Sequence, residues 1–242
     1  MSSEKTYKQA FHSKRKYPSL KFENYFEIFD LLAGHLYDSK ITYLELGVAD
    51  GGSLEIARKL FGEKSTIIGV DLYDDKSFLK DDGTANHIIF GNQTSDETKN
   101  KLISITANSG IDIIVDDGSH ISEDMILSFI KLFPLLNENG IYIIEDLNVI
   151  NSSKHYKSFY GINIFDYMKG LSENLNNPFR DFSRAKDRYK EPRETRKPFS
   201  VKNKGGLLIN DDIVKQIFSI QWFENMVAIT KKTKPEPLSL WI

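Results

Sequence analysis

Two acidic pairs follow short apolar runs of the sequence, at positions where a site could be built. Asp116 and Asp117 follow IDIIV, and Glu145 and Asp146 follow IYII. Burying carboxylates at neighbouring strand ends is costly unless something positive pairs with them, and no Lys or Arg lies within these motifs. A hard divalent cation such as Mg²⁺, Mn²⁺ or Ca²⁺ would compensate the charge, because oxygen ligands without sulfur favour these ions. The alternative is that the first pair caps the following helix or lies solvated in a loop.

A histidine stands just beyond the first acidic pair, in the run DDGSH. The unperturbed pKa of a histidine, about 6.5, suits a general base near neutral pH. His120 could therefore remove a proton from a hydroxyl group held beside Asp117. The competing interpretation is an ordinary loop histidine.

A glycine-rich turn, ELGVADGGS, spans residues 45–53. Small residues let a ligand approach the backbone, and the next helix would begin with free N–H groups. The following apolar run ends on Asp71, whose carboxylate could accept two hydrogen bonds from a ribose diol. A dinucleotide site would favour G-x-G-x-x-G, but Ala49 replaces the second glycine. This weakens an NAD interpretation, and a purely structural turn is the remaining alternative.

Strand and helix patterns alternate through residues 41–147. Continuous apolar runs are typical of strands in a parallel sheet that is covered by helices on both faces. The pattern therefore predicts a doubly wound, Rossmann-like α/β fold, with ligands at the carboxyl ends of its strands. We expect strands over 41–47, 65–74, 87–91, 111–117 and 141–147, and helices over 51–62, 95–107 and 121–136.

The two ends of the chain depart from this alternation. Residues 1–40 are expected to form a loosely held basic arm and an amphipathic helix, in which Phe22, Phe26, Phe29 and Leu32 recur at helical spacing. Residues 41–242 would form the ligand-binding domain, with a helix over 156–175 and a basic, lid-like insertion at about 176–204. Two strand-like runs around Glu224 and Asn225 predict a final hairpin.

Composition narrows the class of protein. The 242 residues carry a net charge of −2 and include no cysteine, which excludes a disulfide framework, a thiolate zinc site and a cysteine nucleophile. No apolar stretch approaches the roughly 20 residues that span a bilayer, and the first residues lack the core of a signal peptide. We expect a cytoplasmic protein.

Residues 180–204 are rich in Lys and Arg. They would form either a surface loop or a lid over an anionic acceptor, and binding of nucleic acid by this segment is a weaker interpretation.

Two stretches carry a family resemblance. ELGVADGGSLEIARKLF, followed by IIGVDLYD, resembles the first two motifs of class I methyltransferases that use S-adenosylmethionine (SAM). IDIIVDDGSHISEDMILSFIKLFPLLNENGIYIIEDL is similar to the sugar O-methyltransferases of macrolide biosynthesis, of the mycinamicin and macrocin type. The resemblance covers about residues 41–150. It implies a seven-stranded sheet whose last strand is antiparallel, a divalent metal, and a sugar hydroxyl as acceptor.

The same resemblance assigns residues to roles. Gly47 and Asp71 would hold SAM, with Gln93 and Asp116 near it, and Glu45, Gly51 and Ser53 complete the predicted cofactor turn. The metal ligands would be Asp117, Glu145 and Asp146, and His120 and Asp117 would be catalytic.

Our leading hypothesis is a SAM- and metal-dependent O-methyltransferase that acts on the sugar of a nucleotide- or lipid-linked sugar or a glycan. Its partner would be that small-molecule or glycan acceptor, anionic if it carries a phosphate; we expect no nucleic acid, and a homo-oligomer is left open. Alternatives are a small polyol, a catechol-like diol or another natural product as acceptor, or a non-catalytic SAM- or nucleotide-binding module.

Overall fold

The computed structural model describes residues 5–148, 162–176 and 211–233. Its helices and strands follow the predicted alternation closely, because the apolar runs and helix caps that define them are strong. In chain order the elements are α1 (Tyr7–His12), α2 (Glu23–Ala33), the 3₁₀ turn η1 (Gly34–Leu36), β1 (Thr42–Leu46), α3 (Gly52–Phe61), β2 (Thr66–Asp71), α4 (Phe78–Asp81), β3 (His87–Phe90), α5 (Asp96–Thr106), β4 (Ile111–Asp116), α6 (Ser122–Leu132), the 3₁₀ turn η2 (Phe133–Leu135), β5 (Leu136–Ile144), α7 (Ile164–Asn176), α8 (Asp211–Gln216), β6 (Ile217–Phe223) and β7 (Met226–Lys231).

The strands form one seven-stranded sheet in the order β3-β2-β1-β4-β5-β7-β6. Strands β1 to β5 pair in parallel, whereas β7 is antiparallel to both β5 and β6. The predicted α/β fold with a C-terminal antiparallel hairpin is confirmed. The chain runs outward from β1 to β3 and then returns to the other side of β1 with β4. Sheets of this kind bind ligands at such a reversal, outside the carboxyl ends of the strands.

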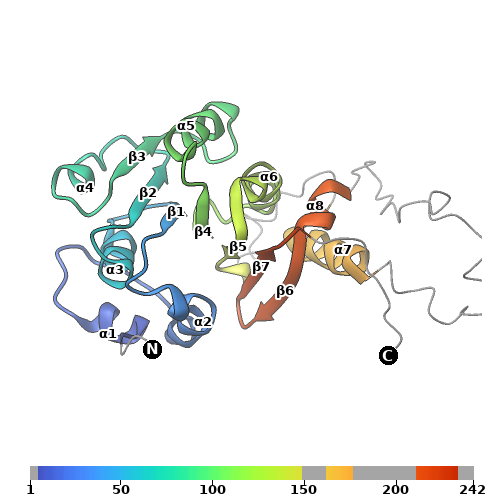
Figure 1. Ribbon diagram of the computed structural model, residues 1–242, viewed down its shortest axis with the longest axis horizontal. Helices are drawn as coiled ribbons and strands as arrows, with labels where there is room; N and C mark the ends of the chain where they lie inside the picture. Colours follow the sequence, from blue (N-terminus) through green and yellow to red (C-terminus); the bar gives the residue numbers. More distant parts are fainter. Residues whose placement is uncertain (1–4, 149–161, 177–210, 234–242) are drawn as a thin grey trace, which may run out of the picture.

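Helices cover both faces of the sheet (Figure 1). One core contains Tyr7 from α1, Phe29 from α2 and Leu60 from α3. The second core contains Leu102 from α5 and Phe129 from α6, with residues of α7 and α8. The central strands are apolar on both sides because their residues belong alternately to these two cores.

The first described residues form a packed helix, so the expectation of a loosely held arm is wrong for residues 5–12. Tyr7 is buried against Phe26 and Phe29, and its backbone N–H donates to Asp30 Oδ1 at 2.7 Å. Phe26, Phe29 and Leu32 form the buried face of α2 as expected, whereas Phe22 precedes the helix and is exposed.

Two smaller parts of the prediction differ from the observed elements or are only partly described. Residues 137–140, which separate the predicted helix over 121–136 from the predicted strand over 141–147, lie inside β5 as a register irregularity: Leu136 pairs with Ile111, and Ile141 pairs with Ile113. The helix expected over 156–175 is described only as α7, and the basic insertion lies outside the described residues beyond its first residue. Within the described part of the chain, no helix is long and apolar enough to cross a membrane.

Candidate active site

The glycine turn after β1 forms the floor of the site. Gly47 has a φ of +83°, and a Cβ atom placed there would overlap the carbonyl oxygen of Asp117. This position therefore needs glycine, because a side chain would meet both backbone strain and a clash. Val48 N–H donates to Asp71 Oδ2 at 2.8 Å, and Tyr73 N–H donates to Asp71 Oδ1 at 3.0 Å. The carboxylate at the end of β2 thus holds the turn after β1.

A cavity of about 840 Å³ opens above this turn. It extends from Asp71 and the glycine turn to Asp117 and His120, so both predicted halves of the site share one space. Residues Pro18 to Lys21, which precede α2, also line this cavity. The volume suits a cofactor together with part of an acceptor.

Four of the seven predicted cofactor residues line this cavity: Gly47, Ser53, Asp71 and Gln93. Gln93 also links two strand ends. Its Nε2 donates to Asp116 Oδ1 at 3.1 Å and to Ser128 at 2.9 Å, while its Oε1 accepts from Ser119 N–H. Gln93 is therefore fixed at the cavity wall by β4 and α6.

Glu45, Gly51 and Asp116 lie behind that wall. Glu45 and Asp116 are fully buried, and burial raises the pKa of each carboxyl to about 7. Tyr43 OH donates to Glu45 Oε2 at 3.0 Å and partly opposes the shift, and Tyr142 and Gln93 do the same for Asp116. Gly51 precedes α3 with a φ of +88°. In this conformation these three residues support the turn, and a contact with cofactor remains a prediction.

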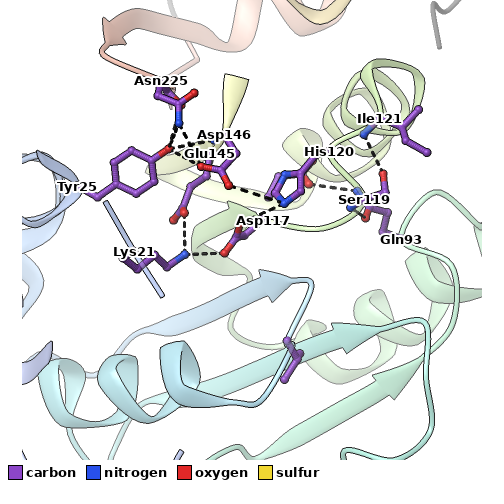
Figure 2. A network of polar contacts seen from close by, with 12 residues as sticks. Lys21, Tyr25, Gln93, Asp117, Ser119, His120, Ile121, Glu145, Asp146 and Asn225 are labelled. Carbon is purple, nitrogen blue, oxygen red and sulfur yellow. Dashed lines mark hydrogen bonds and ion pairs between the residues drawn. The ribbon is translucent and has the colours of Figure 1, made fainter. Parts of the chain in front are cut away.

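Asp117, His120 and Asp146 gather in one cluster (Figure 2), with a ligand atom of each within 4.8 Å of the others. His120 Nε2 lies 3.7 Å from Asp117 Oδ1 and 3.9 Å from Asp146 Oδ2. Both His120 and Asp146 adopt left-handed backbone, with φ of 55° and 56°. Each such residue costs roughly 1–2 kcal/mol, and strain of this kind is typical of functional sites.

The remaining predicted ligand, Glu145, is paired with a lysine that the sequence motifs did not include. Lys21 Nζ lies 2.6 Å from Glu145 Oε2 and 2.6 Å from Asp117 Oδ2, and its side chain is only 4% exposed. Burial alone would lower the pKa of Lys21, but the two carboxylates hold it well above its ordinary value. Burial raises the pKa of Glu145, and the ammonium group opposes that shift. The two 2.6 Å contacts make Lys21 the positive partner of both carboxylates.

A tyrosine hydroxyl organises the other side of the cluster. Tyr25 OH donates to Asp146 Oδ1 at 2.7 Å and accepts from Asn225 Nδ2 at 2.7 Å and from Asp146 N–H at 3.1 Å. Burial and the carboxylate raise the pKa of Tyr25 well above its usual range, so it remains a donor. Asn225 belongs to the turn between β6 and β7, and Tyr25 to α2, so elements from both ends of the chain fix the left-handed Asp146 (Figure 2).

The donor set suits a hard divalent cation. Asp117 Oδ1 and Asp146 Oδ2 face His120, and carboxylate oxygens are preferred ligands of Mg²⁺ and Mn²⁺. Among the described residues, Glu145 Oε1 and His120 Nδ1 are buried without a hydrogen-bond partner. An orphaned carboxylate oxygen beside this cluster is a further acceptor that a cation could satisfy.

Sequence comparison gives a family. A model of the FtsJ-like methyltransferase family matches residues 19–156, more than half of the 242 residues. The 8-demethyl-8-alpha-L-rhamnosyl tetracenomycin-C 2'-O-methyltransferase of Streptomyces olivaceus is 34% identical over 131 residues, which cover 51% of this chain and 32% of that protein. Ribosomal RNA large subunit methyltransferase E of Methanocaldococcus jannaschii is 30% identical over 128 residues, with 52% and 51% covered.

Structural comparison agrees on the fold. The MycE methyltransferase from the mycinamycin biosynthetic pathway, solved in complex with Mg and SAH, superposes with a TM-score of 0.66 at 22% identity, covering 90% of this chain and 51% of that one. This chain therefore spans about a third to a half of the length of these relatives. The predicted resemblance to class I methyltransferases of the macrolide sugar type is confirmed, and the chain belongs to the FtsJ-like methyltransferase family.

Proposed function

We propose that this chain is a SAM- and divalent-metal-dependent O-methyltransferase that acts on a sugar hydroxyl. The observation that supports it most is the single cavity that joins Asp71 and the glycine turn to Asp117 and His120. The curated relative from Streptomyces olivaceus carries a rhamnosyl acceptor in its name, and MycE was solved with Mg and SAH. Both facts favour this cofactor, this ion and this acceptor here.

The cavity suits a cationic cofactor. Asp50, Asp71, Asp117 and Asp124 line it, whereas both of its lysines are already paired with acids, Lys21 with Asp117 and Glu145, and Lys76 with Asp75. Such a surface attracts the positive charge of SAM, whose sulfonium supplies an activated methyl group. Asp71 would hold the ribose diol, and Gln93 and Ser53 would complete the wall.

His120 would act as the general base. Its Nε2 faces the space between Asp117 and Asp146, where an acceptor hydroxyl could be held. The hydroxyl proton moves to Nε2, the oxygen bonds to the methyl carbon, and the carbon–sulfur bond breaks to leave a neutral thioether. Asp117 and Asp146, with Glu145, would hold a divalent ion, which when bound lowers the pKa of a coordinated hydroxyl and fixes its position.

RNA is the second candidate acceptor. Relatives named as ribosomal RNA methyltransferases match a similar share of this chain, and RNA also presents sugar hydroxyls. The expectation that nucleic acid is not a partner must therefore be tested against the alternative that RNA is the acceptor. A cytoplasmic location, a homo-oligomer and an anionic acceptor also remain predictions.

The test is methyl transfer from isotopically labelled SAM to four acceptor classes: nucleotide sugars, glycosylated natural products, catechols and RNA. We expect a glycoside or nucleotide sugar to be labelled, EDTA to abolish labelling, and Mg²⁺ or Mn²⁺ to restore it. His120→Ala should bind SAM as the wild type does and turn over about 10²–10⁴-fold more slowly. Labelling of RNA alone would assign the second candidate, and full activity in EDTA would remove the metal from the proposal. SAM binding without transfer to any class would favour a binding module.

A further inference from the structure

Lys21 occupies the carboxylates that the proposed metal needs. Its ammonium group bonds Asp117 and Glu145 on the side opposite His120 (Figure 2). Two binding arrangements are therefore open to a cation. It could take Asp117, Asp146 and His120 while Lys21 stays, or it could take Asp117, Glu145 and Asp146 after Lys21 leaves.

The two arrangements differ in what they leave for chemistry. A nitrogen lone pair that binds a metal cannot accept a proton, and Nε2 is the His120 nitrogen that faces the cluster, whereas Nδ1 is buried without a partner among the described residues. Only the second arrangement leaves His120 free as the base. A dication beside a retained ammonium on the same Asp117 carboxylate would also be repelled.

Lys21 is part of a strap, residues Lys16–Phe22, that is fixed at both ends. At one end, the backbone N–H groups of Lys16 and Tyr17 donate to Glu55 at 2.8 and 3.2 Å, and Tyr17 OH donates to Asp82 at 2.6 Å. At the other end the strap enters α2. Between these anchors Pro18 and Ser19 pack against Gly52 of α3. Leu20 is 95% exposed, so Lys21 supplies the inward contact of the last part of the strap.

We propose that Lys21 is an exchangeable occupant of the metal site, and that a divalent cation replaces its ammonium group on Asp117 and Glu145, displacing the strap that walls the cofactor cavity. This inference rests on the proposed function for its metal. It assigns Lys21 as a positioning residue. Before the metal binds, its ammonium group compensates the charge of Asp117 and Glu145 and holds their side chains in place. It also makes metal loading and cavity opening one event, because Pro18 to Lys21 form the cavity wall.

Lysine acylation tests the exchange directly in the wild-type chain. A brief pulse of an acetylating ester, followed by peptide mass spectrometry, would compare Lys21 with Lys16, which lies on the same strap with a side chain that is 60% exposed. Without metal, Lys21 should be modified at least about tenfold more slowly than Lys16. Saturating Mn²⁺ should accelerate Lys21 and leave Lys16 unchanged.

A matched pair of variants supplies the second measurement. Lys21→Met should bind Mn²⁺ at least about tenfold more tightly than the wild type in calorimetry, whereas Lys16→Met should bind it equally. If paramagnetic resonance shows Mn²⁺ bound to the wild type while Lys21 stays protected, the exchange is refuted and the metal proposal survives. If Mn²⁺ binds only Lys21→Met, Lys21 blocks the site without exchanging, and the proposed exchange is wrong. If it binds neither chain, both proposals are wrong.

Discussion

Removing the hydroxyl group of Tyr25 should lower both the stability of the chain and its affinity for metal. Tyr25→Phe keeps the buried ring but deletes the oxygen that bonds Asp146 Oδ1 at 2.7 Å, Asn225 Nδ2 at 2.7 Å and Asp146 N–H at 3.1 Å. Asn225 still reaches Asp146 Oδ1 at 3.2 Å, so that acceptor keeps one partner. The backbone N–H of Asp146 loses its partner.

The expected cost follows from these contacts. A hydrogen bond to a charged group contributes about 1.5–3 kcal/mol, and a stranded buried donor costs about 1–3 kcal/mol. Because the two losses share one atom and Asn225 compensates partly, we expect a net loss of about 2–4 kcal/mol. For a chain of this size each 1 kcal/mol lowers Tm by roughly 2–4 °C, so Tm should fall by roughly 5–15 °C. Groups that orient a metal ligand typically change metal affinity about 10–100-fold, and Mn²⁺ affinity should fall within that range.

Tyr37→Phe is the matched control. Tyr37 OH donates to Asp30 Oδ1 at 2.8 Å, and that oxygen also accepts from the backbone of Tyr7. Both variants thus remove a buried tyrosine–aspartate bond, but Asp146 belongs to the candidate metal cluster and Asp30 does not. Tyr37→Phe should lower Tm and leave Mn²⁺ affinity unchanged. If Tyr25→Phe is equally destabilised and binds Mn²⁺ like the wild type in calorimetry, the hydroxyl only stabilises the fold, and the reasoning about Asp146 is wrong.

Three further outcomes are expected. Gly47→Ala should abolish SAM binding and destabilise the chain more than Gly62→Ala, measured by calorimetry and thermal unfolding, because both glycines have positive φ but only Gly47 would meet backbone. Asp71→Asn should weaken SAM binding by about 1.5–3 kcal/mol in calorimetry, and unchanged affinity would contradict its role. The pKa of Glu45 is raised from 4.5 to about 7, so its contribution to stability is complete below pH 4.5 and is lost as the pH rises through 7. Glu45→Gln should therefore flatten the metal-free stability profile from urea unfolding at pH 5 and pH 8 by about 3 kcal/mol, and an unchanged profile would mean that Glu45 is ionised throughout.

The sheet and its motifs were predictable because their signals are local. Apolar runs such as those ending at Asp71 and Asp116 are continuous, and each is followed by a turn residue or a helix cap. Parallel pairing then brings the carboxyl ends of β1, β4 and β5 to one edge without further information. Placing Asp117 and Asp146 together needed only this topology.

The N-terminal part of the site could not be predicted in the same way. Lys21 lies 96 residues from Asp117 and 124 from Glu145 in the chain, and Tyr25 lies 200 residues from Asn225. No periodicity in a basic N-terminal segment tells which lysine turns inward. The useful signal was physical: the acidic strand ends required a positive partner, and the strap supplied one.

The four acidic strand-end residues are compensated in three ways, and the differences indicate where the proposed metal would bind. Asp116 accepts from Tyr142 and Gln93, and its raised pKa favours the neutral form. Glu145 pairs with Lys21, which also takes Asp117 Oδ2, while Tyr25 and Asn225 satisfy Asp146 Oδ1. Asp117 Oδ1 and Asp146 Oδ2 then remain, facing one another across His120. With Lys21 in place, three carboxylates and one ammonium leave two negative charges, which a dication would neutralise. Once Lys21 leaves, the same ion leaves one negative charge, which the sulfonium of SAM would balance. The net charge of the cluster therefore allows both arrangements, whereas the repulsion between a dication and a retained ammonium favours the second. The position of Lys21 in the metal-loaded protein decides between them.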